Sequence, residues 1–543
     1  MLRGTVDWPA DVAARYRAAG YWDGSTLFSV LRNSAQRWPD KAALVAGERR
    51  LSYCELQQQA TRLASRLLAL GLAPRDRVLM QLPNIVEFAV VYFALARIGA
   101  IPVMALRSHR HAEARHFLNA SGASAYVIAG EAGGFDFRAM ADELQADAPA
   151  LREVIVVGDA RPGQRAYATL MHDGPFDEPQ VQVDPADVGT MLLSGGTTSM
   201  SKLIPRTHQD YVLNARLCGR AAGFGEDTVF MAILPLSHNY NLASPGLLAT
   251  LLYGGTVVLA PSTQTDDIFA AVQRERVTVT AAVVPLIATW LASDVDTRYD
   301  LSSLKVVQNG GARLAPELRQ RLRERFGCTP QEIYGTAEGL ISMTRLDDDD
   351  EALLHSSGTP VCEADEIRVL DEQDRDVPDG EAGELVTRGP YTIRGYYDAA
   401  DKNAEAFTAD GYYRMGDIVR KRARYVYAEG RRKDFINRGG EKISCEEIEN
   451  LLFAHPKVKA ATLVAMPDPV FGERACAFVV PHPGESLGFN ELIAFLRQRQ
   501  IASFKLPERL EIVDELPVSP VGKILKRQLR EAIALKLQRE HGA

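Results

Sequence analysis

The segment LLSGGTTSMSKLIPRTH, residues 192–208, joins an apolar run to a loop of serine, glycine and threonine that leads to a lysine. The apolar run predicts a buried strand, and the small loop residues allow backbone N–H groups to approach phosphate oxygens. Because Ser201 rather than glycine precedes the lysine, the P-loop spacing is absent, which disfavours an ordinary P-loop NTPase. A solvent-exposed loop is the alternative interpretation of this segment alone. The candidate phosphate-binding residues are Ser194, Gly195, Gly196, Thr197, Thr198 and Lys202.

On either side of this loop, strand and helix patterns alternate along most of the chain before residue 367. Ser52 and Glu55 have the spacing of a capping box ahead of an amphipathic helix that runs to Gly71. The next apolar run, residues 77–82, predicts a buried strand, and residues 85–98 predict a helix. Further strands are expected at residues 126–128, 256–259 and 306–308. The alternation predicts an α/β fold with layers of parallel strands.

The sequence pattern changes twice toward the C-terminus. From about Ile367, short alternating runs separated by Asp-Arg-Asp and Pro-Asp-Gly predict a β-rich subdomain. After Gly430, helical and strand patterns return in an α+β arrangement, with helices expected at 444–455 and 490–500 and strands at 460–466 and 475–481. We therefore expect a large N-terminal domain of residues 1–429 and a small mobile C-terminal domain of residues 430–543.

The composition disfavours several classes of protein. The 543 residues are 46% hydrophobic and 24% charged, which is typical of a soluble globular protein with two or more domains. A net charge of -8 without a basic cluster disfavours nucleic-acid binding. The six cysteines form no C-x-x-C pair, so neither a disulfide framework nor a zinc site is expected. The richest apolar stretch, residues 85–106, is interrupted by Glu87 and Arg97, and the N-terminus lacks a signal pattern, which favours a cytoplasmic enzyme without a membrane span.

Four later segments share the order and character of known signatures: YGTAEG at 334–339, YYRMGD at 412–417, GRRKDFINRGGEKIS at 430–444 and PVSPVGKILK at 517–526. Together with the glycine-rich loop they resemble the adenylate-forming superfamily, which includes acyl-CoA synthetases, peptide-synthetase adenylation domains and firefly luciferase. The resemblance extends over nearly the whole chain. It implies that ATP and magnesium activate a carboxylic acid as its acyl-AMP, and that the acyl group then passes to a thiol.

The resemblance also assigns roles in nucleotide binding. Glu338 would hold the magnesium, which prefers oxygen ligands, and Asp417 would accept hydrogen bonds from the ribose hydroxyls with help from Arg431. The family usually has threonine directly before this glutamate, whereas Ala337 stands there and Thr336 lies one residue earlier. The remaining nucleotide-binding candidates are Tyr334, Gly335 and Thr336, together with Gly310, Gly311 and Ala312, whose small side chains after Asn309 would let flat rings lie close to the backbone.

Two lysines carry the mechanism that the resemblance implies. Lys433 aligns with the hinge at which the C-terminal domain rotates between two catalytic poses. Lys523 aligns with the catalytic lysine that enters the site for adenylation, where its ammonium would neutralise charge on the carboxylate and the α-phosphate.

The segment LPLSHNYNLASPG, residues 234–246, resembles the stand-alone ligases that activate 2,3-dihydroxybenzoate or salicylate for siderophores. His238 would lie beside the acid as a catalytic residue, and Asn239 would bind the ring 2-hydroxyl. Tyr240 and Gly310 would form pocket walls, and Ile333 and Ile341 would enclose the ring. The pair Tyr240 and Ser244 favours 2,3-dihydroxybenzoate, since salicylate ligases typically have Phe and Cys there. Departures from that group are Asn241, Ala243, Ile341 and Ser342.

Several alternatives stay open at this point. A hydroxypicolinate, an aminobenzoate or salicylate could replace 2,3-dihydroxybenzoate as the substrate. The acceptor is expected to be the phosphopantetheine thiol of a separate aryl carrier protein, because no carrier domain follows Lys526, but an aryl-CoA ligase would use coenzyme A instead. A non-catalytic scaffold protein is a further alternative, suggested by Ser199-Met200-Ser201 where the family prefers Gly-Thr-Pro.

We expect Lys433→Pro to uncouple the two half-reactions, because proline fixes φ and so restricts backbone rotation at the proposed hinge. Adenylation, measured as acid-dependent exchange of pyrophosphate into ATP, should survive while thioester formation is lost. Lys433→Ala leaves φ free and should retain both steps. Unimpaired thioester formation in the proline variant would mean that the hinge lies elsewhere.

Overall fold

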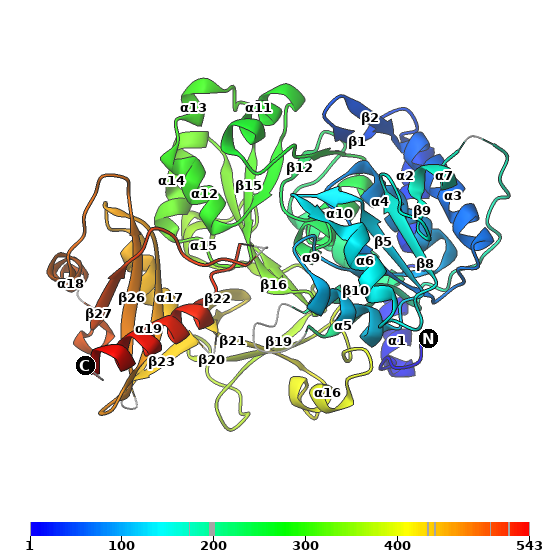
Figure 1. Ribbon diagram of the computed structural model, residues 1–543. Helices are drawn as coiled ribbons and strands as arrows, with labels where there is room; N and C mark the ends of the chain where they lie inside the picture. Colours follow the sequence, from blue (N-terminus) through cyan, green and yellow to red (C-terminus); the bar gives the residue numbers. More distant parts are fainter. Residues whose placement is uncertain are drawn as a thin grey trace.

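Two large, mainly parallel sheets form the body of the N-terminal domain in the computed structural model (Figure 1), which describes residues 2–172, 174–194, 201–431, 434–438, 441–499, 501–519 and 522–541. In the first sheet the inner strands from β16 to β1 are parallel, and the strands at its edges are antiparallel. Its order is β18 (Thr359–Pro360), β17 (Gly339–Met343), β16 (Thr329–Thr336), β15 (Val306–Gly310), β14 (Val279–Ala282), β12 (Val229–Ala232), β13 (Thr256–Leu259), β1 (Ala42–Ala46) and β2 (Arg49–Ser52).

The second sheet is parallel except for its edge strand β11, which turns back antiparallel beside β10. Its order is β11 (Leu203–Thr207), β10 (Val188–Leu193), β4 (Ile101–Met104), β3 (Arg77–Gln81), β5 (Ala125–Ala129), β8 (Glu153–Val157) and β9 (Arg165–Ala166). A small hairpin, β6 (Glu131–Ala132) and β7 (Phe135–Asp136), follows β5.

Helices cover both faces of both sheets, so the layers alternate as in an α/β protein. The shared layer between the sheets contains α2 (Leu27–Arg37), α3 (Tyr53–Ala69), α4 (Val86–Ile98), α8 (His208–Ala221), α9 (Asn239–Ala243) and α10 (Leu247–Leu252). The outer face of the first sheet is covered by α11 (Thr265–Glu275), α12 (Val284–Ala292), α13 (Val295–Arg298) and α14 (Pro316–Phe326). The outer face of the second sheet is covered by α5 (His111–Ser121) and α6 (Phe137–Gln145).

The predicted first helix and the apolar stretch after it are confirmed. Ser52 and Glu55 form the expected capping box at the start of α3, with each side chain bonded to the other residue's backbone N–H. The stretch at residues 85–98 is α4, which is apolar on nearly all sides because it lies in the layer between the two sheets. Within the described ranges, no helix has the length and apolar character that a membrane crossing requires.

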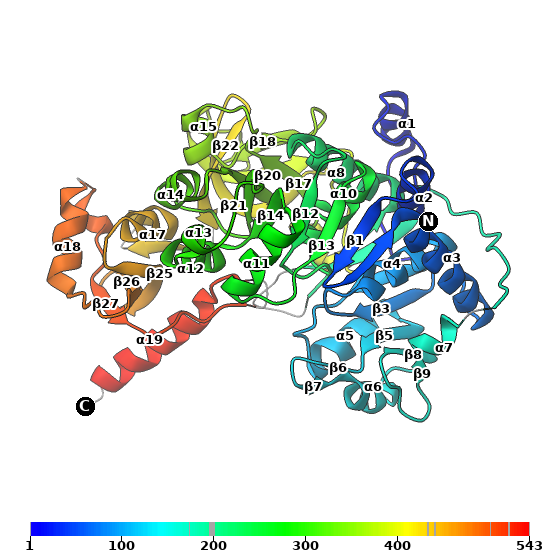
Figure 2. The ribbon, with the colours of Figure 1, turned by 90° about the horizontal axis from the view of Figure 1, so that it is seen from above.

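The predicted β-rich subdomain is an antiparallel sheet, and the C-terminal α+β domain lies at one end of the molecule (Figure 2). The subdomain strands are β19 (Glu366–Leu370), β20 (Ala382–Arg388), β21 (Tyr413–Arg422) and β22 (Tyr425–Arg431). The C-terminal elements are β23 (Phe435–Arg438), β24 (Glu441–Ser444), α17 (Cys445–Phe453), β25 (Val458–Asp468), β26 (Gly472–Pro481), α18 (Phe489–Gln498), a 3-10 turn η2 (Ser503–Lys505), β27 (Arg509–Ile512) and α19 (Lys526–His541). The remaining helices are α1 (Ala10–Ala18), α7 (Tyr167–Leu170), α15 (Asp350–His355) and α16 (Ala400–Ala406).

The bounds of α17, β25, β26 and α18 lie within two or three residues of those predicted from the sequence, whereas β23, β24 and η2 were not predicted. The helix expected at 444–455 begins one residue later because Ser444 is its N-cap, with Ser444 Oγ accepting from the N–H of Glu447. β27 and α19 were not predicted. All six cysteines are free thiols, as expected, and Cys54 is the one that is not fully buried.

Candidate active site

Most of the predicted site residues lie beside the edge of the first sheet at which its parallel strands end. β12, β14, β15 and β16 run in the same direction and are neighbours, so their carboxyl ends share this edge. The segments after these strands contain His238, Val283, Gly311 and Glu338. Segments that are distant in sequence therefore meet where ligands bind in parallel α/β sheets.

The glycine-rich segment lies in the sequence between two strands that pair with each other. β10 and β11 pair antiparallel, with Leu193 opposite Leu203. Where the loop begins and ends, the N–H of Ser194 donates to the carbonyl of Lys202 over 3.0 Å, and the N–H of Lys202 donates to Ser194 Oγ over 2.9 Å. A strand follows this loop, whereas a helix follows a P-loop. The candidates Gly195, Gly196, Thr197 and Thr198 lie outside the described residues.

Lys202 and Glu338 both contact one tyrosine. Lys202 Nζ lies 4.0 Å from the centre of the Tyr396 ring, and the Tyr396 hydroxyl donates to Glu338 Oε1 over 2.8 Å. The Tyr413 hydroxyl lies 3.3 Å from that of Tyr396. The phosphate-loop lysine and the predicted metal ligand therefore lie near each other, as binding to one polyphosphate requires.

Glu338 suits a magnesium site that the substrate completes. Among the residues that the structure describes, no group of three or more His, Cys, Asp or Glu side chains could hold a metal ion. Magnesium is commonly held by one or two carboxylates, with phosphate oxygens and waters as its other ligands. Glu338 is buried, and its hydrogen bond from Tyr396 engages Oε1, which leaves Oε2 for such an ion.

Arg206 joins β11 to the turn that carries Glu338, and this role was not predicted from the sequence. Its fully buried guanidinium donates to Asp210 Oδ1 over 2.9 Å, to the carbonyl of Ala337 over 2.8 Å and to the carbonyl of Tyr391 over 3.0 Å. Thr207 and Asp210 form a capping box at the start of α8. That local pattern could have predicted where the helix begins, but not the distant partners of Arg206.

The nucleotide-binding candidates around YGTAEG are only partly brought together. The Tyr334 hydroxyl donates to Asp417 Oδ2 over 2.8 Å, which joins this segment to the predicted ribose-binding carboxylate. Asp417 lies opposite Arg431 in the pairing of β21 and β22, although the Arg431 side chain is outside the description. The Thr336 hydroxyl donates to the carbonyl of Gly339 over 2.9 Å, so a contact with phosphate would require that hydroxyl to turn. Its phosphate role stays a prediction.

A buried ion pair supports the 309–312 segment from behind. Glu332 and Arg319 are 3.0 Å apart, with side chains only 4% and 1% exposed. The Asn309 amide donates to Glu332 Oε2 over 3.0 Å and to the carbonyl of Ala312 over 2.7 Å. Burial raises the pKa of Glu332, while the Arg319 charge lowers it. Through Asn309 this pair fixes the turn that carries Gly310 and Gly311, and no local sequence pattern predicted it.

The predicted aryl pocket is closely packed around Gly310. A Cβ placed on Gly310 would lie 2.8 Å from the Tyr240 ring, so only glycine allows that ring to rest on the backbone. Ile333 lies next to this glycine in the sheet register, because it pairs with Gly310 itself across β15 and β16. Ile341 pairs with Gly335 on the other side of β16, and both isoleucines are buried. The structure therefore brings Tyr240, Gly310, Ile333 and Ile341 together.

His238 is an uncharged hydrogen-bond donor at the start of α9. Its Nδ1 accepts from the N–H of Tyr240 over 3.3 Å, so the ring proton is on Nε2. Burial, with a smaller contribution from the charge of Lys523, lowers the pKa of His238 to about 4. At neutral pH the ring is therefore neutral and lies near the catalytic-lysine candidate.

Lys523 reaches this site from the C-terminal domain. A Cβ placed on Gly311 would lie 3.6 Å from Lys523 Cε. The lysine belongs to a tight turn in which the N–H of Ser519 donates to its carbonyl over 2.7 Å, and its own N–H donates to Ser519 Oγ over 3.1 Å. Figure 1 shows the segment before α19 reaching from the C-terminal sheet toward β16 and α9. The predicted hinge residue Lys433 lies outside the described residues.

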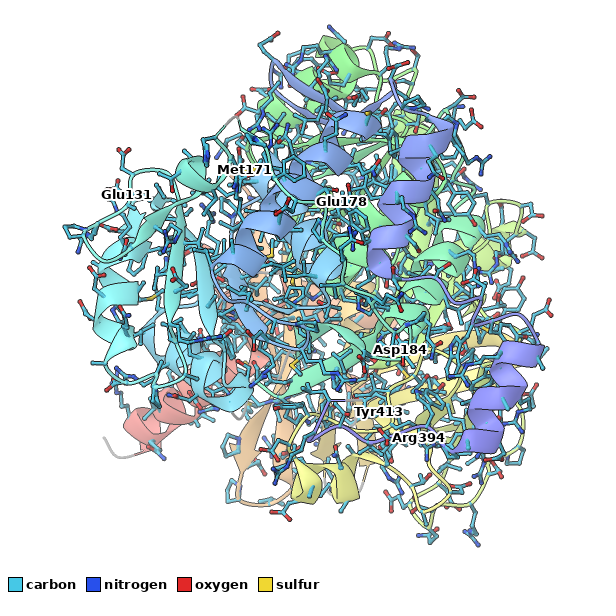
Figure 3. All side chains as sticks on the ribbon, turned by 90° about the vertical axis from the view of Figure 1, so that its right-hand side faces the viewer. Glu131, Met171, Glu178, Asp184, Arg394 and Tyr413 are labelled. Atoms are coloured by element: carbon cyan, nitrogen blue, oxygen red, sulfur yellow. The ribbon has the colours of Figure 1, made fainter. Side chains whose placement is uncertain are left out.

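The N-terminal segment supports the loop that carries Tyr391 and Tyr396. Trp22 Nε1 donates to the carbonyl of Pro390 over 2.9 Å, and the Arg394 guanidinium lies 5.8 Å from the centre of the Trp8 ring. Figure 3 shows Arg394 on the side of the molecule where α1 lies. This packing helps to fix the tyrosine that contacts Lys202 and Glu338.

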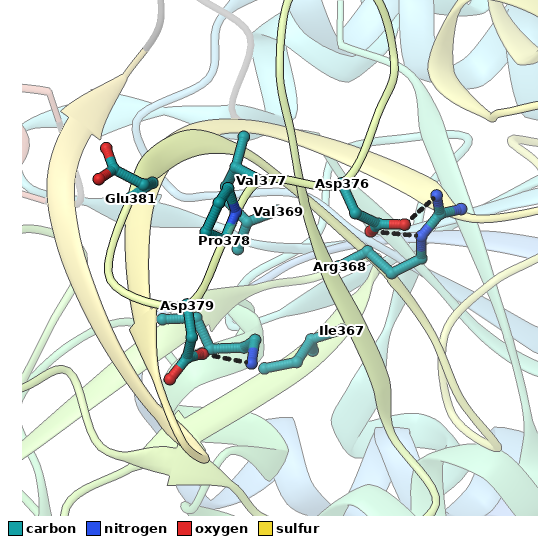
Figure 4. A pocket seen from close by; sticks show the side chains of 9 residues that line it. Ile367, Arg368, Val369, Asp376, Val377, Pro378, Asp379 and Glu381 are labelled. Atoms are coloured by element: carbon teal, nitrogen blue, oxygen red, sulfur yellow. Dashed lines mark hydrogen bonds and ion pairs between the residues drawn. The ribbon is translucent and has the colours of Figure 1, made fainter.

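A separate surface hollow of about 200 Å³ lies in the β-rich subdomain (Figure 4). Four of its charged residues form ion pairs, Arg368 with Asp376 at 2.8 Å and Lys421 with Asp379 at 2.7 Å. None of the predicted site residues lines it.

Comparison with known proteins relates the whole chain to one family. The family model described as "AMP-binding enzyme" matches residues 31–397, and the one described as "AMP-binding enzyme C-terminal domain" matches residues 447–523. The chain is 47% identical to the 2,3-dihydroxybenzoate-AMP ligase of Bacillus subtilis, over 99% of each chain. It is 45% identical to the salicyl-AMP ligase / salicyl-S-ArCP synthetase of Mycobacterium tuberculosis, over 97% of this chain and 94% of that one.

Among solved structures, the chain resembles the apo structure of Mycobacterium smegmatis MbtA. The two share 41% identity and a TM-score of 0.75, with 97% of this chain and 98% of that chain covered.

We expect Arg206→Met to lower the free energy of unfolding by about 3–5 kcal/mol, because it leaves the buried Asp210 carboxylate without its cation. Urea unfolding followed by circular dichroism measures this change. Arg216→Met on the same helix is the control, since its ion pair with Asp23 is partly exposed and should contribute under about 1 kcal/mol. Equal losses in the two variants would contradict the role given to Arg206.

Proposed function

The chain belongs to the AMP-binding enzyme family, and we propose that it is a cytoplasmic aryl acid-AMP ligase whose first candidate substrate is 2,3-dihydroxybenzoate. One observation carries the proposal: Lys523 of the small domain lies near Gly311 and near the neutral His238. Beside them, the Tyr240 ring rests on Gly310, which pairs with Ile333. A cation, an uncharged donor and an apolar slot together suit an aromatic carboxylate.

In the proposed first step, an oxygen of the aryl carboxylate attacks the α-phosphorus of ATP. The bond from that phosphorus to the bridging oxygen breaks, and pyrophosphate leaves with the electron pair. The Lys523 ammonium stabilises the charge that the carboxylate and α-phosphate bring together. Asp417 accepts from the ribose hydroxyls, and Lys202 approaches the polyphosphate. Magnesium bound by Glu338 would reduce the charge of the leaving group.

In the proposed second step, a thiol releases its proton to solvent and its sulfur attacks the acyl carbonyl, and AMP leaves with the electron pair of the acyl–phosphate bond. We propose the phosphopantetheine thiol of an aryl carrier protein in siderophore biosynthesis as the acceptor, because the Mycobacterium tuberculosis relative is named for both activities. We propose that Lys523 acts in the first pose only. Rotation of the small domain at Lys433 would withdraw Lys523 and give the acceptor thiol access to the acyl-AMP.

The test of this proposal is acid-dependent exchange of labelled pyrophosphate into ATP. The panel is 2,3-dihydroxybenzoate, salicylate, benzoate, hydroxypicolinates and aminobenzoates, and we expect the highest kcat/KM with 2,3-dihydroxybenzoate. Holo carrier protein and coenzyme A are then compared as acceptors for the best acid. Silence with every aryl acid would favour a non-catalytic scaffold, and a preference for coenzyme A would favour an aryl-CoA ligase.

Lys523→Ala should lower pyrophosphate exchange by about 100-fold or more, since it removes the cation that stabilises the transition state. Thioester formation from supplied aryl-AMP should stay near the wild-type rate. Lys536→Ala is the control, because Lys536 lies on α19 and pairs with Glu511 away from the site. Normal exchange in Lys523→Ala would remove Lys523 from the mechanism.

Gly522→Ala should also slow adenylation selectively. Gly522 has φ of +76°, and a Cβ there would lie 2.5 Å from Val283 Cγ2 in the large domain. The new methyl group therefore clashes in the pose that brings Lys523 into the site. We expect exchange to fall about tenfold, given the combined cost of the positive φ and the clash. Gly484→Ala, which has φ of +81° but open space around it, is the control for backbone strain alone. Equal effects of the two substitutions would contradict this docking contact.

A further inference from the structure

Asn214 has a buried carbonyl group without a hydrogen-bond partner. The side chain is fully buried on α8, and its Nδ2 donates to the carbonyl of Ala243 over 3.1 Å and to Ser244 Oγ over 2.8 Å. Because the Ala243 carbonyl can only accept, this contact fixes which end of the amide is the nitrogen. Oδ1 is therefore the end of the amide that faces away from Ala243, and no described residue bonds to it. A buried acceptor of this kind is unfavourable unless a ligand supplies a donor.

The position of Asn214 relates this acceptor to the proposed substrate. Lys523 lies by His238, and Asn239 follows His238 on α9. Asn239 Nδ2 donates to Ser244 Oγ over 3.2 Å, and Ser244 in turn contacts Asn214. The side chains therefore form a series from the carboxylate end of the site toward the far end of the ring. Asn239 is the residue expected to bind the ring 2-hydroxyl, and Asn214 is connected to it through Ser244.

The hydrogen bonds of Ser244 determine what it can offer to a ligand. Its hydroxyl oxygen accepts from both Asn214 and Asn239, which uses its two lone pairs. Only its O–H remains, so Ser244 is a donor toward the pocket. Cys218 lies within hydrogen-bonding reach of Ser244, but its sulfur is a weak acceptor that a ligand oxygen can replace.

We propose that Asn214 Oδ1 and the Ser244 O–H together recognise one ring hydroxyl, the 3-hydroxyl of a 2,3-dihydroxybenzoate-type acid. A phenolic hydroxyl both donates and accepts, and these two groups supply one acceptor and one donor. Asn214 is thus a specificity-determining residue, and Ser244 alone does not determine whether an acid with a 3-hydroxyl is preferred. This inference rests on the proposed function, because it requires an aryl acid in the pocket.

The first experiment uses the wild-type protein and two analogues in pyrophosphate exchange. 2,3-Dihydroxybenzoate should have a kcat/KM about tenfold or more above that of 3-fluorosalicylate, whose small fluorine cannot donate to Asn214. Salicylate, which has only hydrogen at that position, should also be weaker. A wild-type protein that uses 3-fluorosalicylate or salicylate as well as 2,3-dihydroxybenzoate would overturn the inference.

The second experiment compares two buried asparagines. Asn214→Leu should lower the ratio of kcat/KM for 2,3-dihydroxybenzoate to that for salicylate by about tenfold or more, with salicylate use nearly unchanged. Asn241→Leu is the matched control, because Asn241 is also fully buried and also has an unpaired Oδ1, but its amide donates to the carbonyl of Leu234. It should lower the activity with both acids equally.

The two proposals fail in different ways. Exchange with no aryl acid would overturn the proposed function and this inference with it. Exchange with an unchanged ratio in Asn214→Leu, or a ratio that falls only in Ser244→Ala, would overturn this inference alone and leave the ligase function in place. If Asn214→Leu does not fold, the analogue series on the wild-type protein decides the question.

Discussion

The arrangement of the site depends on the buried guanidinium of Arg206. An unpaired charge at that position would be strongly unfavourable, so each of its donors requires a fixed partner. Its partners are the Asp210 carboxylate, the carbonyl of Ala337 next to Glu338, and the carbonyl of Tyr391. These groups belong to α8, to the turn after β16 and to the loop that also carries Tyr396. One side chain on β11 therefore positions α8 and the turn that carries Glu338 at the same time.

The charges around the site are arranged for anionic substrates. Lys202 lies against the Tyr396 ring on the side proposed for the polyphosphate, and Lys523 lies near Gly311 on the side proposed for the acid. A second cation next to Lys523 would be repelled by it, and the lowered pKa of His238 avoids that cost. The neutral ring still offers its Nε2–H as a donor. His238 can thus orient a carboxylate without competing with the lysine for charge.

The sequence was informative where local patterns decide the structure. The Ser52 capping box, the strand before the glycine-rich loop and the turn-rich β subdomain each depend on neighbouring residues, and these expectations are confirmed. The roles of Arg206 and Asn214 and the Glu332–Arg319 pair could not be predicted in this way, because their partners lie on other elements. Lys523 was recognisable only by resemblance, since nothing local distinguishes it from other lysines near the C-terminus. Which face of α8 meets α9 is set by packing in the layer between the sheets, and no spacing within α8 encodes it.

The contacts that hold the small domain in this pose explain how it could leave. Lys523 is oriented by bonds to Ser519 within its own turn, so the turn can move as a unit. Against the large domain, Gly522 lies close to Val283, Arg313 lies 3.5 Å from Glu446, and Ser444 Oγ donates to the carbonyl of Glu429 over 2.7 Å. Burial raises the pKa of Glu446 to about 7, although the Arg313 charge acts to lower it. Separation of the domains would break these contacts but not the Ser519 bonds that orient Lys523, as is needed if one domain must present a lysine for the first step and withdraw it for the second.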